Sequence, residues 1–270
     1  MEEHFEEIKF AASLFFDNNK DSLDGKNIVN VCNYIGDFYN SIFSEFGFCI
    51  EEDGKDKNKS YKFTAKNVEK FFSINLNKLS SIYFEKFKEK RDYQDTELSV
   101  RIYIPEDNAY PLKVNITVDP ILVKSFNYNE LIMFIKKIKE FDFLLEYGVA
   151  FVIETRKMPN FFMLGIETPD LSPEEREVAN SLALNVREYK NKIWDIFWIN
   201  IIKKELITQD IYYKIIDIVG NKNVIETDDI YIFFLPLDYS EYLSIQKLDQ
   251  YRLKLRNLFE GNNLIMYKKV

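Results

Sequence analysis

A strict alternation of apolar and polar residues in two neighbouring stretches, 98–104 and 112–118, constrains the fold most. Apolar residues take every second position in both stretches: Leu98, Val100, Ile102 and Ile104, then Leu112, Val114, Ile116 and Val118. A period of two places one face of a strand against a core and leaves the other face in water. The short segment that joins the two stretches, 105–111, therefore predicts an antiparallel hairpin in the middle of the chain.

The rest of the chain mixes strand and helix patterns irregularly. Apolar runs predict strands at 8–16, 149–153, 161–166, 223–235 (interrupted at Asp228-Asp229) and 264–267. Helical spacing and capping residues predict helices from Asp24 to about Phe46, over most of 65–90, from Asn127 to Phe141, from Ser172, from Thr208 to Gly220, and from about 240 to 259. We expect an α+β fold: a mixed or mainly antiparallel sheet covered by helices, with a middle hairpin and a long C-terminal helix.

Chain length and composition allow one large domain or two small ones. The chain has 270 residues, of which 46% are hydrophobic, and its eight glycines and seven prolines form no long linker. We expect a single α+β domain over residues 1–270, with a boundary near 156–172 as the alternative. The charge run Glu51–Lys62 predicts an exposed loop.

The charge balance is acidic, with a formal net charge of −8. Phosphate binding needs a basic surface, so we expect no nucleic acid as a partner, whereas a basic protein would be steered toward the chain. The start, Met1-Glu2-Glu3-His4, lacks the basic and apolar regions of a secretory signal, and no apolar run is long enough for a membrane span. The prediction is a cytoplasmic protein with no membrane partner.

Residues for common catalytic chemistry are scarce. His4 is the only histidine, and Cys32 and Cys49 are the only cysteines. Nucleophiles activated by an imidazole and sites closed by thiolates or histidines are therefore not expected. Glycine-rich phosphate loops are absent as well, so we expect no cofactor, no metal and no enzyme activity. The 44 acidic residues leave a carboxylate-based or metal-assisted enzyme as the alternative.

The two tryptophans lie four residues apart, at Trp194 and Trp198. A helix or a strand would place both on one face. Packing in the core is the interpretation that we favour. An anchor at a protein interface is the alternative, because tryptophan is enriched at interface hot spots.

The predicted elements follow a definite order along the chain. A strand ends in a polar turn at Phe15-Phe16-Asp17, and a long helix, the middle hairpin, a helix and a strand follow. The tryptophan segment Ile193–Asn200 then precedes a short helix, a turn at Gly220, a strand ending at Phe233-Phe234-Leu235-Pro236 and a long terminal helix. This layout resembles the immunity protein 52 group of polymorphic-toxin systems over most of the chain. The resemblance carries over no functional residue; it implies a cytoplasmic protein that binds and neutralises a cognate toxin.

Loops and strand ends are where a binding protein of this kind would carry specificity, since its helices and strands have clear inward faces. Three acidic loops are candidates: Glu51–Asp53, Glu106-Asp107 with Tyr110, and Asp228-Asp229. The second pairs carboxylates with an aromatic ring at a hairpin tip, so the predicted partner-binding residues are Glu106, Asp107 and Tyr110. The alternative is that Pro105 and Pro111 bracket an ordinary solvated loop.

Overall fold

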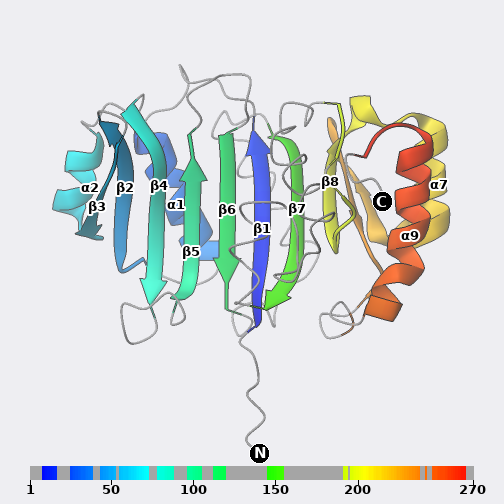
Figure 1. Cartoon of the computed structure of the whole chain (residues 1–270), viewed down its shortest axis with the longest axis horizontal. Helices are drawn as coiled ribbons and strands as arrows, with labels where there is room; N and C mark the ends of the chain where they lie inside the picture. Colours follow the sequence, from blue (N-terminus) through cyan, green and yellow to red (C-terminus); the bar gives the residue numbers. More distant parts are fainter. Residues whose placement is uncertain are drawn as a thin grey trace, which may run out of the picture. The chain divides into compact units, whose positions relative to one another are not determined.

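The structure, a computed structural model, divides into two compact units. The terminal unit comprises Met1–Leu14 with Glu146–Val270, and the central unit comprises Phe15–Leu145. The residues described are 8–16, 25–38, 43–52, 55–72, 78–87, 96–104, 112–119, 145–154, 191–193, 195–237, 241 and 245–265. Helices and mainly antiparallel strands in both units confirm the predicted α+β class (Figure 1). The single domain over 1–270 stays a prediction.

The central unit is built on an antiparallel sheet with the strand order β3-β2-β4-β5-β6. Its strands are β2 (Glu45–Glu52), β3 (Lys55–Lys62), β4 (Leu79–Phe87), β5 (Thr96–Tyr103) and β6 (Leu112–Val118). Strands β5 and β6 pair in register from Leu98 opposite Val118 to Tyr103 opposite Lys113. This pairing confirms the middle hairpin that the alternation predicts.

Aromatic rings form the core of the central unit. Helices α1 (Gly25–Phe38) and α2 (Ala65–Phe72) contact one another, and Ile28, Cys32 and Ile35 of α1 are buried. The ring of Phe71 on α2 lies 5.8 Å from that of Phe46 on β2, which itself stacks on Phe84 of β4 at 5.9 Å. Large rings of this kind contribute much of the free energy of burial.

Three predictions for this part of the chain are wrong. The first helix ends at Phe38, not near Phe46, because Glu45–Glu52 pairs with strands on both sides. The expected loop Glu51–Lys62 is mostly strand β3, with Lys57 to Ser60 exposed. In the described part of the expected helix over 65–90, Ala65–Phe72 is helical, whereas Leu79–Phe87 is a strand.

The terminal unit has a sheet with the strand order β1-β7-β8-β10-β9. Its strands are β1 (Ile8–Phe16, of which the part up to Leu14 belongs to this unit), β7 (Leu145–Glu154, from Glu146), β8 (Ile199–Lys203), β9 (Val224–Glu226) and β10 (Ile230–Phe234). Leu14 and Ile201 approach Gly148 so closely that a Cβ there would lie 2.8 and 3.0 Å from their methyl groups. The predicted strands at 8–16, 149–153 and 223–235 are confirmed, the last as two strands.

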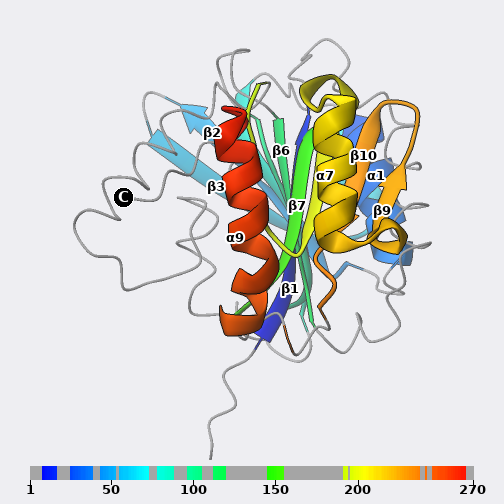
Figure 2. The same cartoon turned by 90° about the vertical axis from the view of Figure 1, so that its right-hand side faces the viewer.

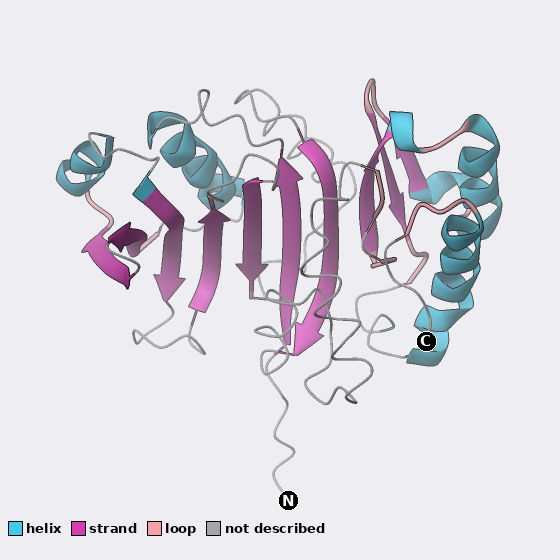
Figure 3. Cartoon of the chain, turned by 45° about the horizontal axis from the view of Figure 1, so that its top comes forward, coloured by secondary structure: helices cyan, strands magenta, loops and turns pink. Residues whose placement is uncertain are grey.

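Two helices cover one face of β10: α7 (Gln209–Val219) and α9 (Ile245–Gly261). Tyr212 of α7 stacks on Tyr231, and Phe259 of α9 stacks on Phe233. Tyr231 and Phe233 are two positions apart on the strand and so share a face. Figures 2 and 3 show α7 and α9 side by side, and the two helices contact one another.

Helix α7 has the ends that the sequence predicts. The Thr208 hydroxyl accepts from the Ile211 amide at 3.4 Å, and Gly220 ends the helix at a φ of 87°. Such a positive φ favours glycine. Two short 3₁₀ turns, η6 (Lys204–Leu206) and η7 (Asn221–Asn223), flank α7 and connect it to the neighbouring strands.

Trp198 belongs to the core, as we expected. It is 8% exposed, and its indole N–H donates to the Leu237 carbonyl at 3.1 Å. The expected strand at 264–267 is represented by one parallel bridge between Ile193 and Ile265. Trp194 and the elements predicted at 127–141, at 161–166 and from Ser172 lie outside the described residues. Among the described helices, none is long and apolar enough to cross a membrane.

Candidate binding surface

The predicted partner-binding residues, Glu106, Asp107 and Tyr110, lie outside the described residues. The structure does show the strands that flank their loop, since Tyr103 of β5 stands opposite Lys113 of β6. Glu51 and Glu52 of the first candidate loop instead end strand β2. The hairpin-tip site therefore stays a prediction.

The third candidate loop, Asp228-Asp229, forms a hydrogen-bonded turn between β9 and β10. The Ile230 amide donates to the Thr227 hydroxyl at 3.3 Å, and the Lys204 amide donates to the Asp229 carbonyl at 2.9 Å. These bonds join the turn to η6, while the Asp228 side chain is exposed. Hydrogen bonds thus order the backbone of this turn, and the charge of Asp228 acts on Lys204.

Three tyrosines form a ladder that runs from solvent into the core beside this turn. Tyr213 of α7 is 58% exposed, and its ring centre lies 5.7 Å from that of Tyr212. Tyr212 stacks on Tyr231 of β10, with ring centres 4.5 Å apart and an interplanar angle of 28°. Tyr231 itself is only 6% exposed. The ladder thus begins at a buried ring, Tyr231, and ends at an exposed one, Tyr213, with Tyr212 in contact with both.

A lysine–glutamate pair lies beside Tyr231, the buried ring of the tyrosine ladder. The Lys204 ammonium donates to Glu226 Oε1 at 2.5 Å and lies 5.3 Å from the centre of the Tyr231 ring. This hydrogen bond raises the pKa of Lys204 and lowers the pKa of Glu226. Burial, followed by the Glu226 charge and a hydrogen bond to it, raises the pKa of the Tyr212 hydroxyl.

These pKa directions decide what the group can do. Lys204 and Glu226 both stay charged at neutral pH, because each holds the other in its ionised form. A general acid or base needs a pKa near the working pH, so the pair is suited to positioning and not to proton transfer. The described residues hold no cluster of three or more potential metal ligands. A carboxylate-based or metal-assisted enzyme stays the alternative, although the described residues include no such group of carboxylates.

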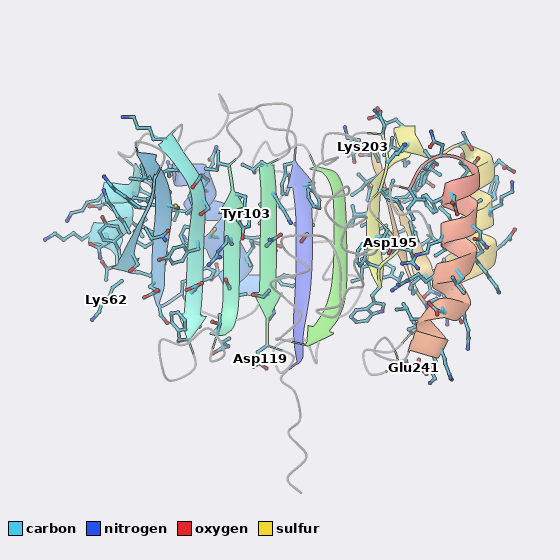
Figure 4. All side chains as sticks on the ribbon, in the orientation of Figure 1. Lys62, Tyr103, Asp119, Asp195, Lys203 and Glu241 are labelled. Atoms are coloured by element: carbon cyan, nitrogen blue, oxygen red, sulfur yellow. The ribbon has the colours of Figure 1, made fainter. Side chains whose placement is uncertain are left out.

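Charged side chains pair with one another on α7 and at the end of β8. Asp210 lies on the exposed side of α7 and pairs with Lys214 at 2.6 Å, and Lys203 pairs with Glu205 at 3.4 Å beside the end of β8 (Figure 4). From Ile199 to Leu237 the chain carries six acidic and four basic residues. We call the following group the tyrosine–acid surface: Lys204, Asp210, Tyr212, Tyr213, Glu226 and Asp228.

Sequence reasoning found one part of this surface and missed the rest. Asp228 belongs to one of the three candidate acidic loops, whereas Tyr212, Tyr213, Lys204 and Glu226 belong to none of them. A signal for Tyr213 exists: Ile211 and Ile215 mark the inner face of α7, and Tyr213 falls nearly opposite both. The stacking of Tyr212 on Tyr231 joins positions far apart in the chain and has no local signal.

The central unit has a second polar group, on the face of β4–β6 opposite the aromatic core. Arg101 lies 3.5 Å from the buried Glu85 carboxylate, and its guanidinium lies 5.6 Å from the Tyr83 ring centre. Lys113 lies 5.5 Å from the Phe15 ring centre, and burial lowers the pKa of its ammonium to about 7. Arg101 and Glu85 balance each other's charge, which suits a structural role.

Comparison with known proteins gives a fold and no family. No family model matches the chain, and no curated protein matches it. The resemblance to the immunity protein 52 group therefore stays a prediction. Among solved structures, a Pseudomonas aeruginosa T6SS protein, PA0821, matches 94% of this chain over 73% of its own length. The TM-score is 0.57 and the sequence identity 14%, so this likeness shows a shared fold alone.

Proposed function

We propose that this chain is a binding protein that neutralises a cognate protein toxin by direct contact. The observation that carries the proposal is the tyrosine–acid surface, where an exposed ring stands on a fixed aromatic and ionic base. The fold that the chain shares with a T6SS protein is in keeping with a setting of toxins and their inhibitors.

Tyrosines held in place are effective binding groups. Binding usually costs free energy because mobile side chains become ordered, and Tyr213 is already supported by Tyr212. Tyrosine is also enriched among the few residues that dominate the free energy of association. Tyr213 is therefore our choice for the central contact with the toxin.

The acidic charge of this chain favours a toxin with a basic binding surface. Asp228 is exposed in the turn before β10, Asp210 is exposed on α7 and paired with Lys214, and the whole chain has a net charge of −8. An acidic surface attracts a basic partner over a distance of about 10 Å at moderate ionic strength and so speeds their encounter. We infer a basic patch on the toxin, whose arginine or lysine side chains would contact the tyrosine rings.

The test begins with the gene beside this one in its source genome. If that gene encodes a toxin domain, co-expression with this chain should restore growth, and the two purified proteins should form a complex by calorimetry. Tyr213→Ala should weaken the complex by about 2 kcal/mol. Phe72→Ala is the matched control, because Phe72 is another exposed ring, at 43%, in the central unit, and its loss should change affinity little.

Two further arms compare the candidate surfaces. Asp228→Lys tests the tyrosine–acid surface, and Glu106→Lys with Asp107→Lys tests the predicted hairpin tip. Loss of affinity in the first variant alone would assign the contact to the tyrosine–acid surface. Full rescue of growth by Tyr213→Ala and Asp228→Lys would rule that surface out, and absence of any complex would refute neutralisation by binding.

A further inference from the structure

Strand β3 forms one end of the central sheet. It pairs with β2 over eight positions, from Glu45 opposite Lys62 to Glu52 opposite Lys55, and it stands last in the strand order. Among the described strands, β2 is its one neighbour. A strand in this position presents backbone groups along its outer edge.

The register shows which backbone groups face outward. The Phe63 amide donates to the Ser44 carbonyl at 2.9 Å, one position beyond the pair Glu45–Lys62. Since residues of an antiparallel pair bond across in alternation, the backbone of Lys59 and Tyr61 faces β2, and that of Asn58, Ser60 and Lys62 faces outward. A hydrogen bond supports this assignment: the Asn67 side chain of α2 donates to the outward-facing Lys62 carbonyl at 3.0 Å.

The edge is basic in an acidic chain. Strand β3 contains Lys55, Lys57, Lys59 and Lys62 against a single acid, Asp56, while the chain as a whole carries −8. The described side chains from Lys57 to Ser60 are exposed on both faces of the strand, and Lys62 is exposed where β3 ends (Figure 4). The lysines would repel a second copy of the same edge and attract a partner of opposite charge.

We propose that strand β3 is a docking edge for an extended acidic segment of a partner protein, which adds to the sheet as one more strand. The outward backbone groups near Asn58 would bond to the added strand, and Lys59 and Lys62 would contact its carboxylates. This site is separate from the tyrosine–acid surface and requires a partner of opposite charge. It does not depend on the proposed neutralisation of a toxin.

The experiment uses the full chain and a short labelled peptide in which pairs of glutamates alternate with pairs of threonines, so that an extended strand carries carboxylates on both faces. Fluorescence anisotropy measures affinity, and hydrogen exchange followed by NMR measures protection of single amides. Bound peptide should slow the exchange of the Asn58 amide by about tenfold or more, with little change at Lys59, whose amide already faces β2.

Two controls separate strand addition from plain charge attraction. Lys59→Glu with Lys62→Glu should weaken peptide binding by about tenfold, whereas Lys222→Glu with Lys254→Glu makes the same change of charge at exposed sites of the terminal unit and should not. A peptide methylated on alternate backbone nitrogens should bind poorly. Equal loss in both double variants, equal binding of the methylated peptide, or an unprotected Asn58 would overturn the proposal. So would self-association through β3 in sedimentation, because the occupant would then be a second copy.

Discussion

Gly47 lies where the central sheet has no room for a side chain. A Cβ at this position would fall 2.3 Å from the Tyr83 ring and 2.5 Å from the Lys59 carbonyl oxygen. The carbonyl is backbone and cannot move without disturbing the β2–β3 pairing. The Tyr83 ring is therefore held over the glycine and lies within reach of Arg101.

Gly47→Ala should lower the free energy of unfolding by about 2 kcal/mol, because the added methyl group overpacks a closed site. Gly261→Ala is the matched control, since a Cβ there meets nothing within 4 Å at the end of α9. The control should be neutral or more stable by up to about 1 kcal/mol. Urea unfolding measures both, and equal stability of the two variants would contradict the close approach.

Lys113 should make stability depend on pH. Burial lowers the pKa of its ammonium from 10.5 to about 7, so between these values the folded chain holds fewer protons than the unfolded chain. Stability due to Lys113 therefore rises with pH across this window, and below it the cost of burying the charge is largest. The Phe15 ring favours the charged form and limits the effect.

Replacing Lys113 with methionine removes the charge and keeps most of the volume. Lys113→Met should stabilise the fold more at about pH 6 than at about pH 9, because the penalty for the buried charge is relieved mainly at low pH. Exposed Lys66→Met serves as the control. Urea unfolding at both pH values is the measurement, and a stabilisation that does not change with pH would show that Lys113 keeps an ordinary pKa.

A nearly buried ion pair joins helix α9 to Asp195, which lies in the segment before β8. Arg256 donates from Nε to Asp195 Oδ1 at 2.7 Å and from Nη2 to Asp195 Oδ2. The two side chains are 13% and 14% exposed, and Asp195 also accepts from the Ile196 amide at 2.8 Å. The pair joins α9 to the segment that leads into β8.

Removal of either partner should leave the charge of the other unpaired in a nearly buried site. Arg256→Ala and Asp195→Ala should each cost about 3 kcal/mol, and the double variant should cost clearly less than the sum. The exposed pair Lys214–Asp210 is the control, with an expected coupling below about 0.5 kcal/mol. A double-mutant cycle in urea measures the coupling, and additive losses would show that the two residues act separately.

Elements with a clear period could be predicted, and elements that depend on neighbours could not. The alternation of Leu98 to Ile104 fixed β5, and Thr208 with Gly220 fixed α7. Phe46 continues the helical spacing of α1, yet it lies in a strand because β3 and β4 satisfy the backbone of β2 on both sides. Tertiary pairing outweighs local spacing there.

Two other strands lacked the period that identifies a strand. Strand β4 shifts register against β5 between Lys86 and Phe87. It also shifts against β2 between Leu79 and Ser81, which stand opposite Ile50 and Cys49, so its apolar residues do not alternate throughout. Strand β3 buries little and therefore reads as a polar loop in the sequence. Its edge position, and not an apolar pattern, explains its composition.

At the scale of the whole molecule, the sequence predicted the α+β class and a candidate acidic loop, but not the binding surface around it. Lys204, Tyr212, Glu226 and Tyr231 come from a 3₁₀ turn, a helix and two strands. Nothing in the spacing of these four residues shows that they meet. When tertiary contacts bring a site together from different elements, the sequence indicates it through composition alone. Here that indication is the many tyrosines of an acidic chain.

The terminal unit is assembled from both ends of the chain, and this has a consequence during synthesis. Strand β1 leaves the ribosome before β7, its neighbour within the terminal unit, which follows only after the central unit has been made. Within the terminal unit, the apolar segment Ile8–Leu14 therefore lacks its neighbouring strand until β7 has been made, and an apolar strand in this state readily associates with other chains. We expect ribosome-bound chains that stop before Leu145 to bind a chaperone at Ile8–Leu14 more tightly than chains in which β7 is complete.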